Sequence, residues 1–174
     1  MRALRILIVA AAALAAACSP SLDWREFRWP EGGFAVLLPG KPRSESRTIT
    51  IDGVEVTMRM FSAQAEGLAF GVGYADFPAG ASGDARARRV AATRDSLVAN
   101  VDGRLTAQTD VMLDGHRGTD FRAKGRVRDV DYFVAGRAYA VGDRLYELAV
   151  VGRAEAESKA DADLFLGSFR LLPE

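Results

Sequence analysis

Residues 48–58 read TITIDGVEVTM, and this stretch belongs to the strongest local pattern in the sequence, a series of hairpin signals. Two β-rich runs flank the dipeptide Asp52-Gly53. Asp-Gly supplies the positive φ angles of a two-residue type I′ turn, so the stretch predicts a β-hairpin. The same signal recurs in LDGH at residues 113–116, VGDR at residues 141–144 fits a type II′ turn, and Lys124-Gly125 is a weaker fourth candidate. Such turns join neighbouring antiparallel strands.

The segments around these turns are also rich in β-forming residues. We expect further strands at residues 33–38, 68–77, 105–113, 117–123, 127–141, 144–152 and 169–172. Two segments break this pattern. Apolar residues recur at helical spacing over residues 82–101, where Ser82 is a suitable N-cap, and a second helix is expected from Glu155 to Gly167. This order predicts an α+β single domain, mainly an antiparallel β-sheet with two principal helices packed against it.

The composition excludes several classes of protein. The chain has 174 residues, a formal net charge of zero, 49% hydrophobic residues and 26% charged residues, which is typical of one globular domain. A net charge of zero gives no general attraction to nucleic acid, so we expect no nucleic-acid partner. One Cys cannot form an internal disulfide, and one Cys with one His does not make up a zinc ligand set. We expect no metal and no cofactor.

The N-terminus resembles a secretory signal. Arg2 and Arg5 precede an uncharged run of 12 residues, Ile6 to Ala17. Spanning a bilayer takes about 20 residues, so this run is short for a transmembrane helix. Its small residues lie directly before Cys18 and resemble the bacterial lipobox, in which the Cys is lipidated. The leucine departs from that motif, because Leu14 lies four residues before Cys18 where three is usual.

This resemblance implies a signal peptide at residues 1–17, a lipid anchor in the membrane through Cys18, and an outer-membrane lipoprotein facing the periplasm. The outer-membrane expectation comes from Ser19. By resemblance to Gram-negative lipoproteins, a residue other than Asp directly after the lipidated Cys favours export to the outer membrane. Ordinary signal peptidase cleavage, which would release a free protein, is the alternative. We expect residues 18–27 to form a short tether and residues 28–174 to form the domain. Such a tether spans about 30 Å at most and holds the domain close to the membrane.

Three motifs carry a family resemblance: GFAVLLPGKP at residues 33–42, YADFP at residues 74–78 and FLGSFRL at residues 165–171. They resemble a broad class of bacterial exported proteins with a PsbP/Mog1/DcrB-like fold. The resemblance runs from about Phe27 to the end of the chain and implies that fold. Known members serve as a photosystem accessory subunit, a partner of a small GTPase and an envelope lipoprotein. None of these roles can be assigned to particular residues here, and Gly167 stands where many relatives have Asp.

Two groups of residues could carry chemistry. His116 is the one side chain that titrates near neutral pH, but no serine is marked as its nucleophile, so we interpret it as an exposed turn residue. A dense acidic region could converge on Ca²⁺, although cross-strand ion pairs with the interleaved arginines explain it better. This region comprises Asp110, Asp114, Asp120, Asp129 and Asp131.

Other features could bind a partner. Four arginines in the first half of the long helix form a possible docking face for an anionic headgroup or protein, or else an ordinary solvated face: Arg86, Arg88, Arg89 and Arg94. Trp24, Phe27 and Trp29 either pin the chain start onto the core or lie in the membrane interface. The glycines of residues 67–73 belong to a strand, where they allow close packing by a helix or line a groove.

These observations favour a non-enzymatic envelope lipoprotein whose domain binds or supports another envelope component, most simply an envelope protein. A small-ligand or lipid carrier, with a pocket between sheet and helices, is the alternative. A hydrolase that uses His116 is a third and weaker hypothesis.

Overall fold

The Asp-Gly turns form where the sequence predicts them. In this computed structural model, which describes residues 22–173, Asp52 and Gly53 join strand β3 (Arg43–Ile51) to β4 (Val54–Ala65). Their φ angles are 49° and 76°, as a type I′ turn requires. Asp114 and Gly115 join β6 (Gly103–Leu113) to β7 (His116–Val127) in the same way. The hairpin at residues 48–58 is therefore confirmed.

One turn prediction is wrong. Lys124-Gly125 lies inside β7, and the chain reverses instead at Arg128 and Asp129, before β8 (Val130–Val141). Both turn residues have positive φ, 48° and 63°, without a glycine to reduce the steric cost. The pairing of β7 with β8 continues to the last residue before this turn, Val127 opposite Val130, so strand pairing holds it in place. Glu66-Gly67 forms a further turn, which joins β4 to β5 (Leu68–Asp76).

The strands form two antiparallel sheets. The larger has seven strands in the order β3-β4-β5-β9-β8-β7-β6, where β9 is Arg144–Arg153. The smaller has the order β1-β2-β10, with β1 at Trp24–Trp29, β2 at Phe34–Pro39 and β10 at Arg170–Leu171. The α+β class with a mainly antiparallel sheet is therefore confirmed.

The long helix α2 (Gly83–Ala99) forms as expected. The Ser82 side chain accepts a hydrogen bond from the Ala85 amide at 3.2 Å, which caps the helix N-terminus. Within residues 22–173, the structure has no helix that is both long and apolar enough to cross a bilayer.

The second expected helix, Glu155 to Gly167, is wrong as a single element. It is divided into a 3₁₀ helix, η2 (Ala154–Lys159), and a short α-helix, α3 (Ala162–Gly167). Asp161 between them has φ 42°, and a right-handed helix cannot continue through a left-handed residue. Its neighbour Ala160 is fully buried, so core packing fixes the break.

The domain also begins earlier than residue 28. Leu22 is only 1% exposed, and β1 pairs with β2 from Trp24 opposite Pro39. Part of the expected tether, residues 18–27, is therefore sheet. The physical reason is that Trp24 and Phe27 pack against the aromatic core, at ring-centroid distances of 5.3 Å from Phe70 and 4.9 Å from Phe61 respectively.

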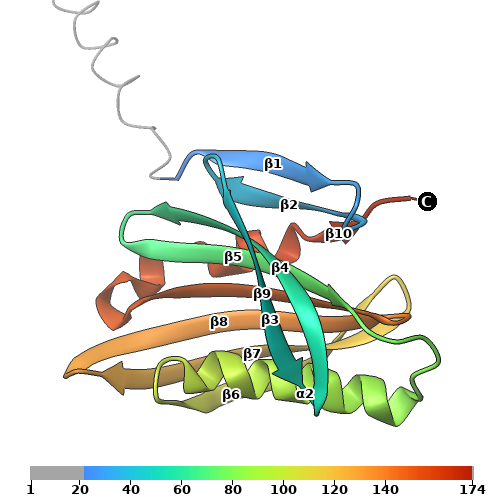
Figure 1. The fold of residues 1–174 in the computed structure, drawn as a ribbon. Coiled ribbons are helices and arrows are strands. Elements are labelled where there is room, and N and C mark those ends of the chain that lie inside the picture. Colours follow the sequence, from blue (N-terminus) through green and yellow to red (C-terminus); the bar gives the residue numbers. More distant parts are fainter. Residues whose placement is uncertain (1–21, 174) are drawn as a thin grey trace, which may run out of the picture.

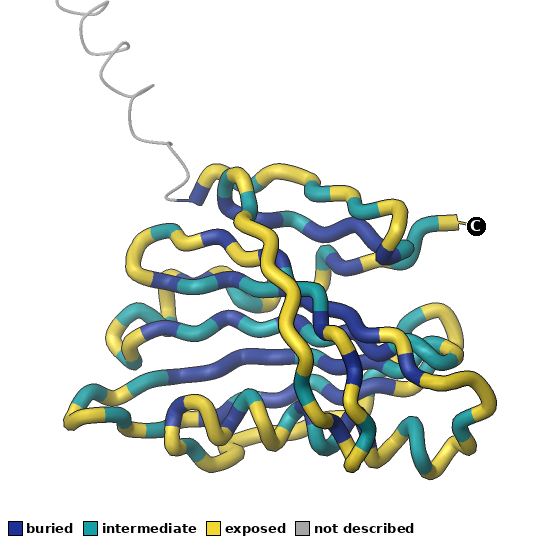
Figure 2. The backbone as a smooth tube through the Cα atoms, in the orientation of Figure 1, coloured by how far each residue is buried: buried dark blue, intermediate teal, exposed yellow. Residues whose placement is uncertain are grey.

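The large sheet is covered differently on its two faces (Figure 1). Alternation along β8 separates them: Phe133 and Ala135 belong to the core beneath the small sheet and α3, whereas Val134 packs with residues of α2. The small sheet with η2 and α3 covers one face, and α2 covers part of the other. Figure 2 shows buried residues concentrated along the central strands.

Candidate functional site

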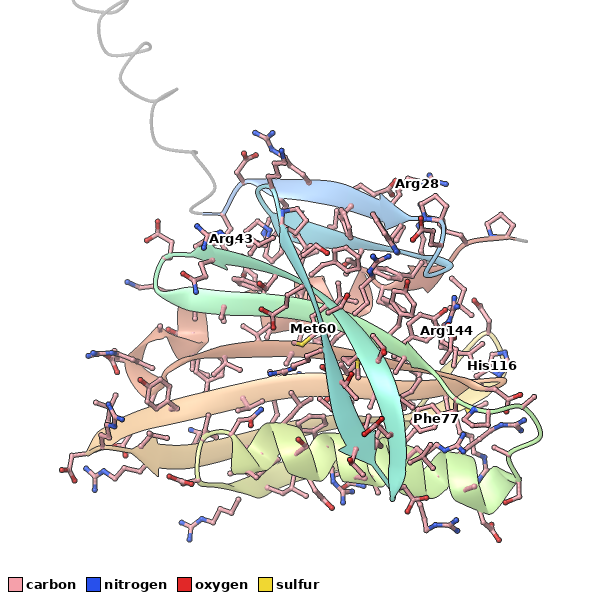
Figure 3. The ribbon with its side chains drawn as sticks, viewed as in Figure 1. Arg28, Arg43, Met60, Phe77, His116 and Arg144 are labelled. Atoms are coloured by element: carbon pink, nitrogen blue, oxygen red, sulfur yellow. The ribbon has the colours of Figure 1, made fainter. Side chains whose placement is uncertain are left out.

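The helix-bearing face of the large sheet is only partly covered. Helix α2 packs on β6 to β9. Beyond the helix, three rows of cross-strand neighbours run over β4, β5 and β9. Their residues are half-buried or exposed, except for Gly73, which is buried. We name this surface the open face. It consists of Met60, Ser62, Gln64, Ala69, Gly71, Glu147, Ala149 and Val151. Figure 3 labels Met60 near the centre of this view, where β3 and β4 pass in front of the sheet.

Small residues make the floor of the open face. A Cβ on Gly71 would lie 4.0 Å from the Phe61 carbonyl oxygen and would be in no closer contact beyond its chain neighbours, so no helix of residues 22–173 lies over it. Gly71 therefore lines an open surface and does not serve the close packing of a helix. At the end of the face is a depression of about 380 Å³, lined by Gln64, Ala65, Glu66, Gly67, Leu68, Ala69, Tyr132, Val151 and Gly152.

Glu147 is the only acid on this floor. It stands opposite Gly73 in the sheet, and a Cβ on Gly73 would come within 3.2 Å of Glu147 Cγ and 3.3 Å of Oε1. Glycine is required there because any side chain would displace the carboxylate. Burial raises the pKa of Glu147 to about 7, and the positive charge of Arg47 opposes part of that rise. No hydrogen bond or ion pair within residues 22–173 satisfies its carboxylate.

Strand β3 forms a wall beside this floor. In a flat sheet, β3 and β9 lie three strands apart, which is about 14 Å. Yet Arg47 on β3 acts electrostatically on Glu147 of β9, and Figure 1 shows β3 crossing in front of β9. The β3–β4 hairpin therefore curls over the sheet. The Arg47 guanidinium lies 3.3 Å from the sulfur of Met60.

The opposite face of the sheet carries a polar cluster around Asp120. Its carboxylate accepts from Arg122 at 2.6 Å and from Arg137 at 2.5 Å. Arg122 also pairs with Asp163 of α3 at 2.6 Å, and Arg137 donates to the carbonyl oxygen of Leu166 at 3.1 Å. These bonds fasten α3 to the sheet. A second depression of about 380 Å³ lies beside them, lined by Arg122, Phe133, Ala135, Glu157, Ser158, Asp161, Ala162, Asp163 and Leu164.

Removing the Arg137 guanidinium should destabilise the fold. Replacing Arg137 by Met keeps the alkyl stem but leaves the Leu166 carbonyl and one Asp120 oxygen without their donor, at an expected cost of about 1–2 kcal/mol. Urea denaturation measures this cost. Arg126→Met is the matched control, because its ion pair with Asp131 is exposed and contributes less than about 0.5 kcal/mol. Equal losses in the two variants would contradict a structural role for the cluster.

The acidic region does not converge on one point. Asp120 and Asp131 form cross-strand pairs with Arg137 and Arg126, as the ion-pair interpretation expects. Asp114 and Asp129 occupy turns, and Asp110 lies exposed on β6. His116, labelled in Figure 3, follows the β6–β7 turn and is half-buried rather than fully exposed. Within residues 22–173, no hydrogen bond joins its ring to a serine or an acid.

The four helix arginines have separate intramolecular neighbours. Arg86 donates to the Gly142 carbonyl at 2.7 Å, Arg88 to Asp52 at 3.2 Å, and Arg94 to Asp95 and Gln108, both at 2.8 Å. Arg89 is only 8% exposed, and its guanidinium lies 4.0 Å from the centre of the Phe77 ring. The structure therefore does not gather them into one free cationic surface, and a docking role for any of them stays a prediction.

The aromatic residues at the chain start pack inward. Trp24, Phe27 and Trp29 are half-buried against the core, as the interpretation that they fix the chain start expects. The other residue predicted from the N-terminus, Cys18, lies outside the described residues. The acid Glu147 was not singled out by the sequence analysis.

No protein-family model matches this chain, and no curated protein does. Solved structures do. The chain is similar to cyanobacterial PsbP (CyanoP) from Synechocystis, with 14% identity, a TM-score of 0.57, and coverage of 90% of this chain and 95% of that one. LpqN of Mycobacterium tuberculosis, involved in cell envelope biogenesis, gives 11% identity, a TM-score of 0.49, and coverage of 87% and 79%. PA94 from Pseudomonas aeruginosa, a protein of unknown function, gives 10% identity, a TM-score of 0.41, and coverage of 79% and 88%.

The likeness to CyanoP extends over nearly the whole described domain. It confirms the PsbP/Mog1/DcrB-like fold that the three sequence motifs imply. At this level of identity the similarity is one of fold, and a shared fold does not assign a function.

Proposed function

We propose that this chain is a bacterial envelope lipoprotein whose domain faces the periplasm and binds another envelope component, rather than catalysing a reaction. The outer membrane is the proposed site of its anchor. The observation that carries the proposal is the spacing between Cys18 and Leu22, the first residue that the structure describes, which is already buried. Four residues extend to about 14 Å at most, so an anchor on Cys18 would hold the domain directly at the membrane.

The chain start is tied to the domain in a way that suits such an anchor. The Gly40 amide donates to the Asp23 carbonyl oxygen at 3.0 Å, and the Trp24 amide donates to the Leu22 carbonyl oxygen at 3.1 Å. The core behind them is built of interlocking aromatic rings, among them Phe34 and Phe61 at 6.1 Å. The residues that follow the proposed anchor are therefore hydrogen-bonded to the small sheet and packed against the core. A domain held this way can act on neighbours in or near the same membrane.

The carrier alternative is less well supported. A lipid carrier needs an enclosed apolar cavity. The depression beside α3 is lined partly by charged side chains, among them Arg122, Glu157 and Asp163. The depression at the end of the open face has Gln64 and Glu66 on its rim. These linings suit a protein contact better than a lipid tail.

Replacing Cys18 by alanine in the full chain should release the protein from the membrane. We expect the parent chain to sediment with outer membranes and its N-terminal peptide to carry an acylated Cys18 by mass spectrometry. Cys18→Ala should lose acylation and leave the outer-membrane fraction completely. Ser19→Ala is the control that keeps the anchor, and Ser19→Asp should move the protein to the inner membrane. An unmodified Cys18 in the parent chain would overturn the proposed anchor.

A further inference from the structure

The open face offers a site for a cation. Glu147 stands in the first of the three rows of the face, with Met60 and Gly73, and has no hydrogen-bond donor or ion-pair partner within residues 22–173; its carboxylate lies over Gly73 of the adjacent strand. A partly buried carboxylate without a donor is costly, and an incoming ammonium or guanidinium would relieve that cost. Burial already raises the pKa of this group to about 7. The floor therefore holds an acceptor for which residues 22–173 supply no donor.

The surroundings of Glu147 suit the stem of a long basic side chain. Met60 is half-buried and stands in the same cross-strand row as Gly73 and Glu147. Thioether side chains are flexible and polarizable, so they adapt to an alkyl stem. Gly71 and Ala149 in the next row leave space for a backbone to approach.

Strand β3 offers backbone hydrogen bonds beside the same floor. It is the end strand of the seven-stranded sheet and pairs with β4 over nine residues in regular register, and no strand of residues 22–173 pairs with its second edge. All of its residues except Ile49 and Ile51 are exposed, and Figure 2 shows the exposed segment that crosses in front of the sheet. The other end strand, β6, is interrupted by a bulge between Leu105 and Ala107. An extended segment therefore adds more readily to β3.

We propose that the open face binds an extended segment of a protein partner along the second edge of β3, and that Glu147 receives a lysine or arginine side chain of that segment. This inference rests on the proposed function, because it names the surface and the chemistry by which an envelope protein would be bound. The positive charge of Arg47, which lies on the wall, opposes the raised pKa of Glu147. An incoming base therefore competes with Arg47.

The charges of Glu147 and Arg47 can be removed separately, and the proposal expects different effects on crosslinking from the two substitutions. A photo-crosslinking amino acid replaces the exposed Ser62 of the open face in the full chain, expressed in its native host. The control probe replaces Thr109 on β6, at the far edge of the sheet. We expect the Ser62 probe to capture a protein whose crosslinked peptide contains a lysine or arginine within a few residues. Glu147→Gln should reduce the yield about tenfold, the value of one charge-assisted hydrogen bond, whereas Arg47→Gln should not reduce it.

Each other outcome overturns the inference. Loss of capture with Arg47→Gln but not with Glu147→Gln would identify an acidic segment. A lipid or a small molecule on the Ser62 probe would exclude a protein partner at this face. Capture from Thr109 alone would reject the open face while the proposed function stands. Capture from neither probe would count against both. Thermal unfolding of each variant verifies that the domain is folded.

Discussion

Replacing Phe34 by alanine should lower the free energy of unfolding by about 3–5 kcal/mol, the usual range for a buried phenylalanine. Phe34 on β2 is fully buried and joins the two sheets. Its ring centroid lies 5.6 Å from that of Phe169, 6.1 Å from those of Phe61 and Tyr146, and 6.2 Å from that of Tyr74. The substitution removes one ring from all of these pairs and leaves a cavity between the sheets. Urea denaturation measures the loss.

The location of the damage is as informative as its size. Hydrogen exchange should accelerate first in β1 and β2, because those strands are held to the large sheet through Phe34 and its neighbours. Phe34→Leu is the matched control and should cost less than about 2 kcal/mol, since it keeps most of the buried apolar volume. A loss below about 1 kcal/mol for Phe34→Ala would mean that the small sheet is not fastened by this core.

The turns show which parts of the fold the residues determine locally. Asp52-Gly53 and Asp114-Gly115 form hairpins because glycine takes the positive φ of the second position at little cost. Arg128 and Asp129 take the same conformation without glycine, and strand pairing on both sides compensates for the strain. That turn was not predictable, because its cause lies in the pairing of β7 with β8 and not in the turn residues.

The second helix fails for a related reason. Residues 155–167 have helical spacing throughout, yet Asp161 adopts a left-handed conformation and divides the segment. Burial of Ala160 and the pairing of Asp163 with Arg122 fix the two halves separately against the sheet. Helical periodicity records which residues face the core, but it does not record where the surface beneath them bends.

Glu147 carried a signal that could have been recognised. Glu147 lies on the same face of β9 as Leu145, Ala149 and Val151, which are spaced two residues apart. This face of the strand is therefore apolar except for a single acid. An isolated acid in such a row indicates either a buried ion pair or an unsatisfied carboxylate. The sequence could not decide between them, because that depends on how far α2 extends over the sheet and on the path of β3.

Replacing Glu147 by glutamine should stabilise the protein above neutral pH and change little in acid. The pKa of Glu147 is raised by burial from 4.5 to about 7 in the folded state, so the folded protein holds this proton at pH values where the unfolded chain has lost it. Below about pH 4 the group is protonated in both states and contributes nothing. As pH rises from about 4.5 to 7, the unfolded state ionises first and stability falls.

The full shift corresponds to about 3 kcal/mol, and partial exposure of the side chain reduces the expected gain at pH 8 to about 1–3 kcal/mol. Urea denaturation of both proteins at pH 4 and pH 8 measures the difference. Glu45→Gln removes an exposed acid from the adjoining β3 and should change stability by less than about 0.5 kcal/mol at either pH. If Glu147→Gln proved equally neutral at pH 8, the carboxylate would already be satisfied, by Arg47 or by water, and a partner's cation would gain nothing by reaching it.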